Sequence, residues 1–313
     1  MTGTYSEWLD SIAFLGPKGT FADSALSGLA SVAGVPTVPA ESVPKAFEMV
    51  RSEAVDAALV PIENSVEGSV SVTLDELNGS TDLVILDEIV LPVQFALVAR
   101  PETTLADVTA VGTHPHAAAQ CRGWLAENLP RAQTIPSMST AGAATTLLSD
   151  SAPYDAAIVP PIAAQRYPLT VLAQDIADNV EAWTRFVLVG RSGRVPEPTG
   201  NDKTSLVLFI RANQSGALLE ILTELAVRGV NLTRIESRPT RRVLGEYSFS
   251  VDLEGHLSDA RVAEALMGLK RVCADVRFVG SYPRHNQGPT PAPVGTTDAD
   301  YAAAADWLRS LEN

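Results

Sequence analysis

The stretch NVEAWTRFVLVG at residues 179–190 divides sharply into a polar half and an apolar half. The apolar half is a continuous run of strand-forming residues, which predicts a buried strand. Thr184 and Arg185 lie where the polar run ends, at the mouth of that strand. A hydroxyl can donate a proton, and the planar guanidinium fork suits a carboxylate. On its own the pair is more typical of a strand beside a surface arginine than of a binding site, so the rest of the chain must decide.

The composition indicates a multidomain protein with enough apolar residues for several cores. Its 313 residues are 46% hydrophobic and 19% charged, and the chain exceeds the length that one core usually supports. The formal net charge of -14 argues against nucleic acid or an anionic membrane as the main partner. Cys121 and Cys273 are far apart and lack CxxC spacing, so a disulfide framework and a zinc site are not expected. Residues 1–10 lack the pattern of a signal peptide, and no run of about 18 apolar residues occurs, so we expect a cytoplasmic protein.

Polar residues follow two predicted strands in the first third of the chain. The strand at 12–15 ends in a glycine-rich loop, and Thr20 is placed to cap the next helix, whose N-terminus can face an anion. The spacing of that loop is not that of a Walker phosphate loop. The buried strand at 57–62 leads into Glu63-Asn64-Ser65. Because open α/β sheets bind ligands at the carboxyl ends of their strands, these side chains are candidate site residues.

A second series of strands and helices begins at the strand 109–112. Thr113 stands at the mouth of a helix predicted to continue through Cys121, and on that helix His116 and Gln120 share one face. His114 and His116 are two residues apart and do not converge on one helical face, so a metal site is not expected. Strands alternate with helices of about ten residues, which predicts parallel sheets in two α/β lobes with a cleft between them.

The last third of the chain has a different organisation. Residues 191–203 are rich in Pro, Gly and charged residues and are predicted to be a linker. The elements expected after it follow the βαββαβ order of a ferredoxin-like unit, with strands at 204–211, 232–238, 245–253 and 276–281 and helices at 216–228 and 258–272. A Pro/Gly-rich segment and a terminal helix complete the chain, and that helix is expected to dock on its own subunit or on a neighbour.

Taken together, these motifs resemble, in order along the chain, those of the prephenate dehydratase family with a C-terminal ACT regulatory domain. The resemblance covers residues 12–282, nearly the whole chain. The motifs that carry it are GPKGTF at 16–21, PIENS at 61–65, THP at 113–115, QC at 120–121, TRF at 184–186, GAL at 216–218 and ESRP at 236–239.

The resemblance implies an α/β fold with two kinds of domain. A catalytic domain would occupy residues 11–191 as two periplasmic-binding-protein-like lobes, the first about 11–99 plus 168–191 and the second about 100–167. A ferredoxin-like ACT domain would occupy 203–283, and a tail with the terminal helix 284–313. The implied reaction is the decarboxylating dehydration of prephenate to phenylpyruvate in phenylalanine biosynthesis, by a lyase that needs neither cofactor nor metal.

The resemblance also implies roles for individual residues. Thr184 would donate a proton to the leaving hydroxyl, and Arg185 would anchor a carboxylate of the substrate. The expected catalytic residues are Thr184, Glu63 and Asn64, and the expected substrate-binding residues are Arg185, Phe186, Thr20, Ser65, Thr113 and Gln120. The expected effector-binding residues are Gly216, Ala217, Leu218, Glu236, Ser237, Arg238 and Pro239.

The chain departs from the family pattern at three places. His116 stands where many members have Gln, residues 181–183 stand where an Asn is usual, and Ser215 stands where Pro is common. Two other functions stay open: an arogenate dehydratase, and a non-catalytic ACT-containing regulator that binds an amino acid. The expected partners are prephenate, phenylalanine as effector, and further copies of the chain in a homodimer or homotetramer, with no nucleic acid and no membrane.

Overall fold

The computed structural model describes Tyr5 and residues 8–212, 214–240, 247–285, 288 and 291–311. The first two residues of the strand predicted from 245 therefore lie outside the described residues. Two compact units are present, one made of Met1–Gly3, Leu74–Glu88 and Leu188–Asn313, the other of Thr4–Thr73 and Ile89–Val187. In the described part of the chain, no helix is long and apolar enough to cross a membrane.

Three sheets are formed by the described residues, and the first combines strands from residues 12–92 with β11 from much later in the chain. Its order is β2 (Thr37–Ala40), β1 (Ile12–Leu15), β3 (Ala57–Asn64), β11 (Trp183–Arg191) and β5 (Leu83–Pro92), and the short β4 (Gly68–Ser69) pairs with β3. β1 is parallel to both β2 and β3; the strands predicted at 12–15 and 57–62 are β1 and most of β3, whereas β2 was not predicted. The helices α1 (Phe21–Gly28) and α2 (Val43–Arg51) pack on β1 and β3, while α3 (Ser71–Gly79) follows β4.

The second sheet has the order β10 (Thr170–Ala173), β6 (Ala96–Ala99), β9 (Ala156–Val159), β7 (Ala110–Thr113) and β8 (Gln133–Pro136). β7 is parallel to β8 and β9, but β6 is antiparallel to both β9 and β10. The prediction of wholly parallel sheets was therefore wrong for this sheet. The chain enters β6 directly from β5 of the first sheet, so β6 is not part of the strand–helix–strand pattern on which the prediction of parallel strands rested.

The helix predicted to run through Cys121 is divided into α4 (Pro115–Gln120) and α5 (Arg122–Asn128). Cys121 leaves helical geometry at the break, with φ −119° and ψ 16°. The carboxylate of Asp178 accepts the first free backbone N–H groups of α5, from Gly123 at 2.8 Å and Trp124 at 3.1 Å. This side-chain cap stabilises a new helix start at that point. The remaining helices beside this sheet are α6 (Thr140–Leu147) and α7 (Pro161–Arg166).

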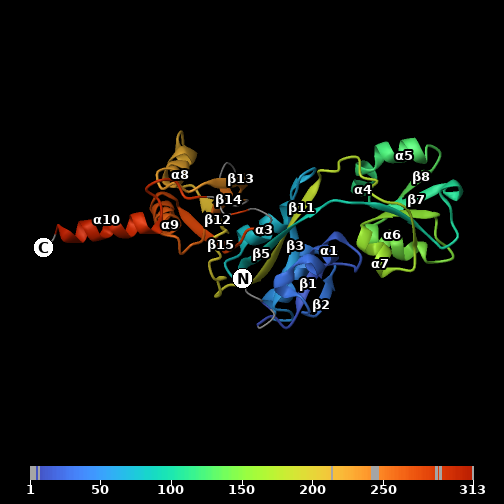
Figure 1. Cartoon of the computed structure of the whole chain (residues 1–313), viewed down its shortest axis with the longest axis horizontal. Helices are drawn as coiled ribbons and strands as arrows, with labels where there is room; N and C mark the ends of the chain where they lie inside the picture. Colours follow the sequence, from blue (N-terminus) through green and yellow to red (C-terminus); the bar gives the residue numbers. More distant parts are fainter. Residues whose placement is uncertain are drawn as a thin grey trace. The chain divides into compact units, whose positions relative to one another are not determined.

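The third sheet has the order β13 (Leu232–Pro239), β14 (Tyr247–Glu254), β12 (Asp202–Phe209) and β15 (Asp275–Pro283), all pairs antiparallel. With α8 (Ala217–Ala226) and α9 (Ala260–Val272) it follows the predicted βαββαβ order (Figure 1). Its core joins apolar residues of one sheet face to both helices, among them Leu206, Leu208, Val251, Ile221 and Leu269.

The terminal helix α10 (Asp298–Ser310) begins with a capping box, in which the Thr297 hydroxyl accepts the Asp300 N–H and the Asp300 carboxylate accepts the Thr297 N–H. Trp307, Leu308 and Leu311 at its end are exposed.

Candidate active site

A cavity of about 710 Å³ lies within the unit formed by Thr4–Thr73 and Ile89–Val187. Its volume is in the range of small-ligand sites. Both the first and the second sheet contribute to it, the first through the ends of β1, β3 and β11 and the second through the starts of α4 and α6. We call it the cleft cavity. Its polar lining includes Thr20, Asn64, His114, Gln120, Ser139 and Thr184.

Asn64 and Thr184 meet in the cleft cavity from adjacent strands. The Asn64 side chain donates from Nδ2 to the Thr184 hydroxyl oxygen at 2.7 Å. Its own Oδ1 accepts the backbone N–H groups of Val66 at 2.8 Å and Glu67 at 2.9 Å, which fixes which end of the amide faces Thr184. Thr184 is 9% exposed. Because the amide donates to the Thr184 oxygen, the hydroxyl proton is left to point elsewhere.

Ser65 holds the start of β11 and does not line the cleft cavity. Its backbone N–H donates to the carbonyl of Trp183 at 2.9 Å, and its hydroxyl accepts the Trp183 N–H at 2.9 Å. These two bonds place the residue directly before Thr184. Phe186, two residues further, is buried in the protein interior with 3% exposure.

Glu63 and Arg185 form an ion pair with each other, 3.7 Å between Oε2 and Nη1, and neither lines the cleft cavity. Successive residues of a strand point to opposite faces of a sheet. Asn64 and Thr184 face the cavity, so their neighbours in sequence face the other side. The Arg185 side chain is 5% exposed. The sequence predicted that Arg185 binds a carboxylate of the substrate; the carboxylate it pairs with here is that of Glu63.

The N-termini of two eight-residue helices, α1 and α6, lie at the cleft cavity. Thr20 caps α1, with its hydroxyl oxygen accepting the Asp23 N–H at 3.4 Å, and Ser139 caps α6, accepting the Gly142 N–H at 2.8 Å. Thr20 and Ser139 both line the cavity. Helix N-termini carry a partial positive charge and free N–H groups, which favour anions. Of the described residues that line the cavity, none is Lys or Arg.

Two histidines and two glutamates are the titratable groups among the described lining residues. The rings of His114 and His116 lie perpendicular to each other with centroids 5.0 Å apart. His116 Nδ1, on α4 beside the second sheet, lies 3.8 Å from Oε1 of Glu67, in the loop between β3 and β4 of the first sheet. Burial and the neighbouring His116 lower the pKa of His114, against a smaller opposing effect of Glu67.

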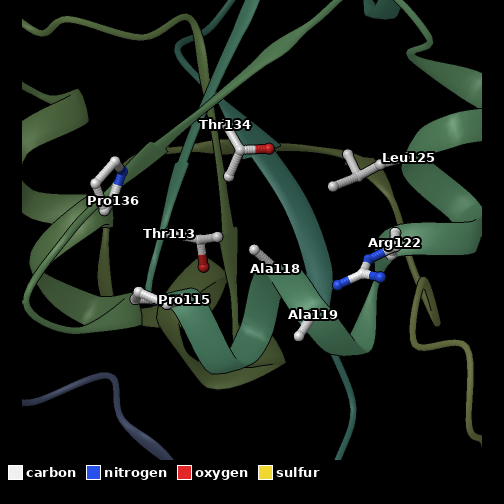
Figure 2. Close-up of a pocket in the computed structure, with 8 residues that line it drawn as sticks. All are labelled: Thr113, Pro115, Ala118, Ala119, Arg122, Leu125, Thr134 and Pro136. Atoms are coloured by element: carbon white, nitrogen blue, oxygen red, sulfur yellow. The ribbon is translucent and has the colours of Figure 1, made fainter.

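Gln120 lines the cleft cavity, but Thr113 does not. Thr113 is fully buried, and its hydroxyl donates to the Ile158 carbonyl at 2.8 Å, which joins β7 to β9. It borders a second, smaller pocket of about 370 Å³. Figure 2 shows this pocket, with Thr113 and Thr134 on neighbouring strands and Arg122 reaching toward Ala119 from the start of α5.

Sequence reasoning missed several residues that line the cleft cavity. Ser139, the N-cap of α6, was not predicted as a site residue, and the strand β8 before it was not predicted either. The available signal was a serine directly before a helical stretch, since serine is a preferred N-cap residue. Glu41 and Glu67 carried no such signal, because each lies in a loop next to a polar stretch.

The two stretches expected to bind an effector lie at the start of α8 and on β13. Gly216 is the N-cap of α8 with φ +88°, a conformation that favours glycine, while Ala217 and Leu218 form its first turn. Glu236, Ser237, Arg238 and Pro239 are the second half of β13. Arg238 donates from Nε and Nη2 to Asp75 Oδ1 at 3.0 and 2.5 Å, and from Nη1 to Glu236 Oε1 at 3.2 Å. Burial alone would lower the pKa of Arg238, but these bonds raise it.

No group of three or more His, Cys, Asp or Glu side chains with metal-binding geometry occurs in the described part of the chain. Cys121 and Cys273 are both buried, and burial raises the pKa of the first thiol to about 12 and of the second to about 11.

Comparisons with known proteins agree over almost the whole chain. Residues 12–194 match the family model described as prephenate dehydratase, and residues 204–271 match that of the ACT domain. A curated prephenate dehydratase of Amycolatopsis methanolica is 44% identical over 302 residues, which cover 96% of this chain and 97% of that protein. The crystal structure of a prephenate dehydratase from Arthrobacter aurescens in complex with L-Phe is similar with a TM-score of 0.91 and 49% identity, covering 96% of this chain and 99% of that one. A further solved structure, GqqA, described as a novel type of quorum quenching acylase, has a TM-score of 0.77 and 30% identity over 87% of this chain and 97% of its own.

Proposed function

The chain belongs to the prephenate dehydratase family, and we propose that its cleft cavity performs the decarboxylating dehydration of prephenate to phenylpyruvate. In this step the bond between the ring and its carboxylate breaks, its electron pair enters the ring, and CO₂ is released. The bond between the ring and its hydroxyl breaks in concert, and the hydroxyl takes up a proton and leaves as water. Aromatisation provides the driving force, so the protein has to supply a proton donor, an anion-binding surface and a defined orientation.

The observation that carries this proposal is the hydrogen bond from Asn64 to Thr184. The amide can only donate in this arrangement, because its oxygen is occupied by two backbone N–H groups. Thr184 therefore keeps its proton available for an acceptor in the cavity, and the amide stabilises negative charge that develops on the Thr184 oxygen during transfer. These are the properties expected of a group that delivers a proton to a leaving hydroxyl.

The other expected site residues take more modest roles in this proposal. Thr20, with the N-terminus of α1, and Gln120 bind the substrate directly, since both line the cavity. Ser65 acts through the start of β11. Glu63 and Arg185 hold β3 and β11 together on the face away from the cavity, and Arg185 would have to leave Glu63 to reach a substrate carboxylate.

Substitution of Thr184 tests the proposed reaction. We expect Thr184→Ala to lower the turnover of prephenate by about 10²–10⁴-fold, the usual effect of losing a proton donor, and Thr184→Ser to keep most of the activity. Phenylpyruvate formation is followed by its absorbance, with an enzyme-free reaction subtracted at every pH. Turnover of the Ala variant near that of the wild type would remove Thr184 from the mechanism.

Arogenate dehydration is a second candidate, because the carboxylates of Glu41 and Glu67 line the cavity and could pair with the ammonium group that arogenate carries in place of the ketone. Parallel assays with prephenate and arogenate decide between the two substrates through their kcat/KM values. An acylase reaction is less well supported, because a threonine nucleophile needs a base that takes its proton, and Asn64 offers Thr184 a donor.

Regulation by phenylalanine completes the proposal. The similar structure from Arthrobacter aurescens contains L-Phe, and this chain carries an ACT domain. We assign phenylalanine to the neighbourhood of residues 216–218 and 236–239, and expect a cytoplasmic homodimer or homotetramer. Gly216 and Arg238 substitutions that leave the response of turnover to phenylalanine unchanged would contradict this assignment, and light scattering measures the oligomer.

A further inference from the structure

The cleft cavity has an unusual charge balance for a site that binds a dianion. Prephenate carries two carboxylates, whereas the described lining residues include Glu41 and Glu67 and neither Lys nor Arg. The N-termini of α1 and α6 contribute partial positive charge only. His114 and His116 are the only described lining side chains that can carry a full positive charge. This reasoning rests on the proposed function, since it takes prephenate as the ligand.

The geometry of the two histidines indicates where their protons lie before substrate binds. His114 Nδ1 accepts the backbone N–H of His116 at 3.3 Å, so a neutral His114 carries its proton on Nε2. Burial and the neighbouring His116 both lower the pKa of His114, so without ligand the neutral form of its ring is favoured near neutral pH. The two rings are 5.0 Å apart, and two positive charges at that separation repel each other.

We propose that the His114–His116 pair takes up a proton when the dianionic substrate binds, and so supplies the positive charge that the cleft cavity otherwise lacks. The groups that face the pair are Glu67 from the loop between β3 and β4, at 3.8 Å from His116, and Glu41, which lines the same cavity from the loop after β2. The negative charge of Glu67 also favours protonation of the pair. The two substrate carboxylates add a larger negative charge, and the pair becomes protonated when they bind.

Proton uptake on binding makes the affinity depend on pH in one direction. When the pKa of a histidine rises on binding, its protonated form stabilises the complex. This stabilisation is complete at a pH below the pKa of the histidine in the free protein, and it is lost as the pH rises through the pKa of the histidine in the complex. A charge of opposite sign within about 4–6 Å raises the pKa of a histidine by about 1–3 units, and we take the lower end of this range. A rise of about one unit corresponds to about a tenfold rise in KM over the whole titration. Because the pKa of His114 starts below its ordinary value, only part of this rise falls above about pH 6.

Steady-state kinetics of the full chain from about pH 6 to pH 8.5 test the proposal. KM of the wild type is expected to rise by several-fold, at most about tenfold, while kcat changes less. In His116→Arg the charge is permanent, so KM stays low up to the highest pH. In the double variant His114→Asn, His116→Gln the charge is absent, so KM is high and independent of pH; Asn at 114 keeps a good helix cap for α4.

A matched control is His285→Gln, a histidine on the other unit whose pKa is also lowered by burial. Its pH dependence of KM should equal that of the wild type. Thermal unfolding of each variant checks that the fold is retained, and His116→Arg keeps the test decisive if the double variant does not fold.

Two results overturn the proposal: a wild-type KM that does not change with pH, or a His116→Arg variant whose KM rises with pH as in the wild type. Failure of the proposed function looks different. In that case the wild type forms no phenylpyruvate from prephenate at any pH, and KM cannot be measured at all.

Discussion

Replacing Asn64 by Asp changes one group of the Asn64–Thr184 pair and almost none of its shape. Asp keeps the oxygen that accepts the N–H groups of Val66 and Glu67, but it replaces the NH₂ donor by a second oxygen. Thr184 then has to donate its own proton to the carboxylate at position 64. The hydroxyl group stays in place while the direction of its hydrogen bond is reversed.

The expected loss follows from this reversal. A proton committed to the introduced carboxylate is not available to the leaving hydroxyl, and the same carboxylate disfavours negative charge on the Thr184 oxygen. Removing one donor that stabilises developing charge in a transition state lowers kcat by about 10²–10³-fold, and we expect Asn64→Asp to fall in this range. The free energy of unfolding should change by only about 1 kcal/mol, since one hydrogen bond replaces another.

The measurement combines phenylpyruvate formation with urea unfolding of the same preparations. Asn128→Asp is a matched control, because Asn128 is exposed and its Nδ2 donates to a backbone carbonyl, that of Trp124, at 3.0 Å. It introduces the same charge into the same unit and should leave kcat unchanged. If Asn64→Asp turns over prephenate within about threefold of the wild type, the polarity of this bond has no part in the reaction.

Two further predictions concern other parts of the molecule. Gly216→Ala should lower the free energy of unfolding by about 1 kcal/mol, because φ +88° strains an L-residue although nothing lies within 4 Å of the added Cβ. It should also weaken the response of turnover to phenylalanine. Urea unfolding and turnover with added phenylalanine measure the two effects, and unchanged values of both would contradict them. Cys121 and Cys273 should not react with a chromogenic disulfide reagent at about pH 8 in the folded protein. Their thiol pKa values of about 12 and about 11 leave roughly one thiolate in 10⁴ and in 10³ molecules. Both should react once urea unfolds the chain, and labelling of either thiol in the native protein would show the burial to be wrong.

Those parts of the molecule whose signal lies in buried residues were predicted well from the sequence. The strand 57–62 was recognised by its apolar run, and it corresponds to most of β3, whose first four residues are fully buried. The run after Thr184 was likewise recognised, and it forms β11. Asn64 and Thr184 were selected because each stands at an end of such a strand, and the structure brings their side chains together at 2.7 Å.

Exposed edges and strand faces explain what was missed. β2 and β8 lie at sheet edges and contain Pro39 and Pro136. At least half of the side chains of each strand are exposed, so no apolar alternation marks them. The sequence also did not show which of two neighbouring residues faces the cavity. Thr184 and Arg185 are adjacent in the same motif, but successive residues of a strand point to opposite faces, so Thr184 lines the cavity and Arg185 pairs with Glu63.

The place of β11 in the first sheet has a consequence for how the active site comes into existence during synthesis. β11 lies between β3 and β5 in the sheet, yet it follows both of them in the chain by about a hundred residues. A nascent chain that has completed β5 has two of these strands without the one that separates them. The hydrogen bond between Asn64 and Thr184 cannot form until residue 184 has been synthesised, after all strands of the second sheet. We expect no fragment that ends before β11 to hold the site, so activity appears late and all at once as the chain grows.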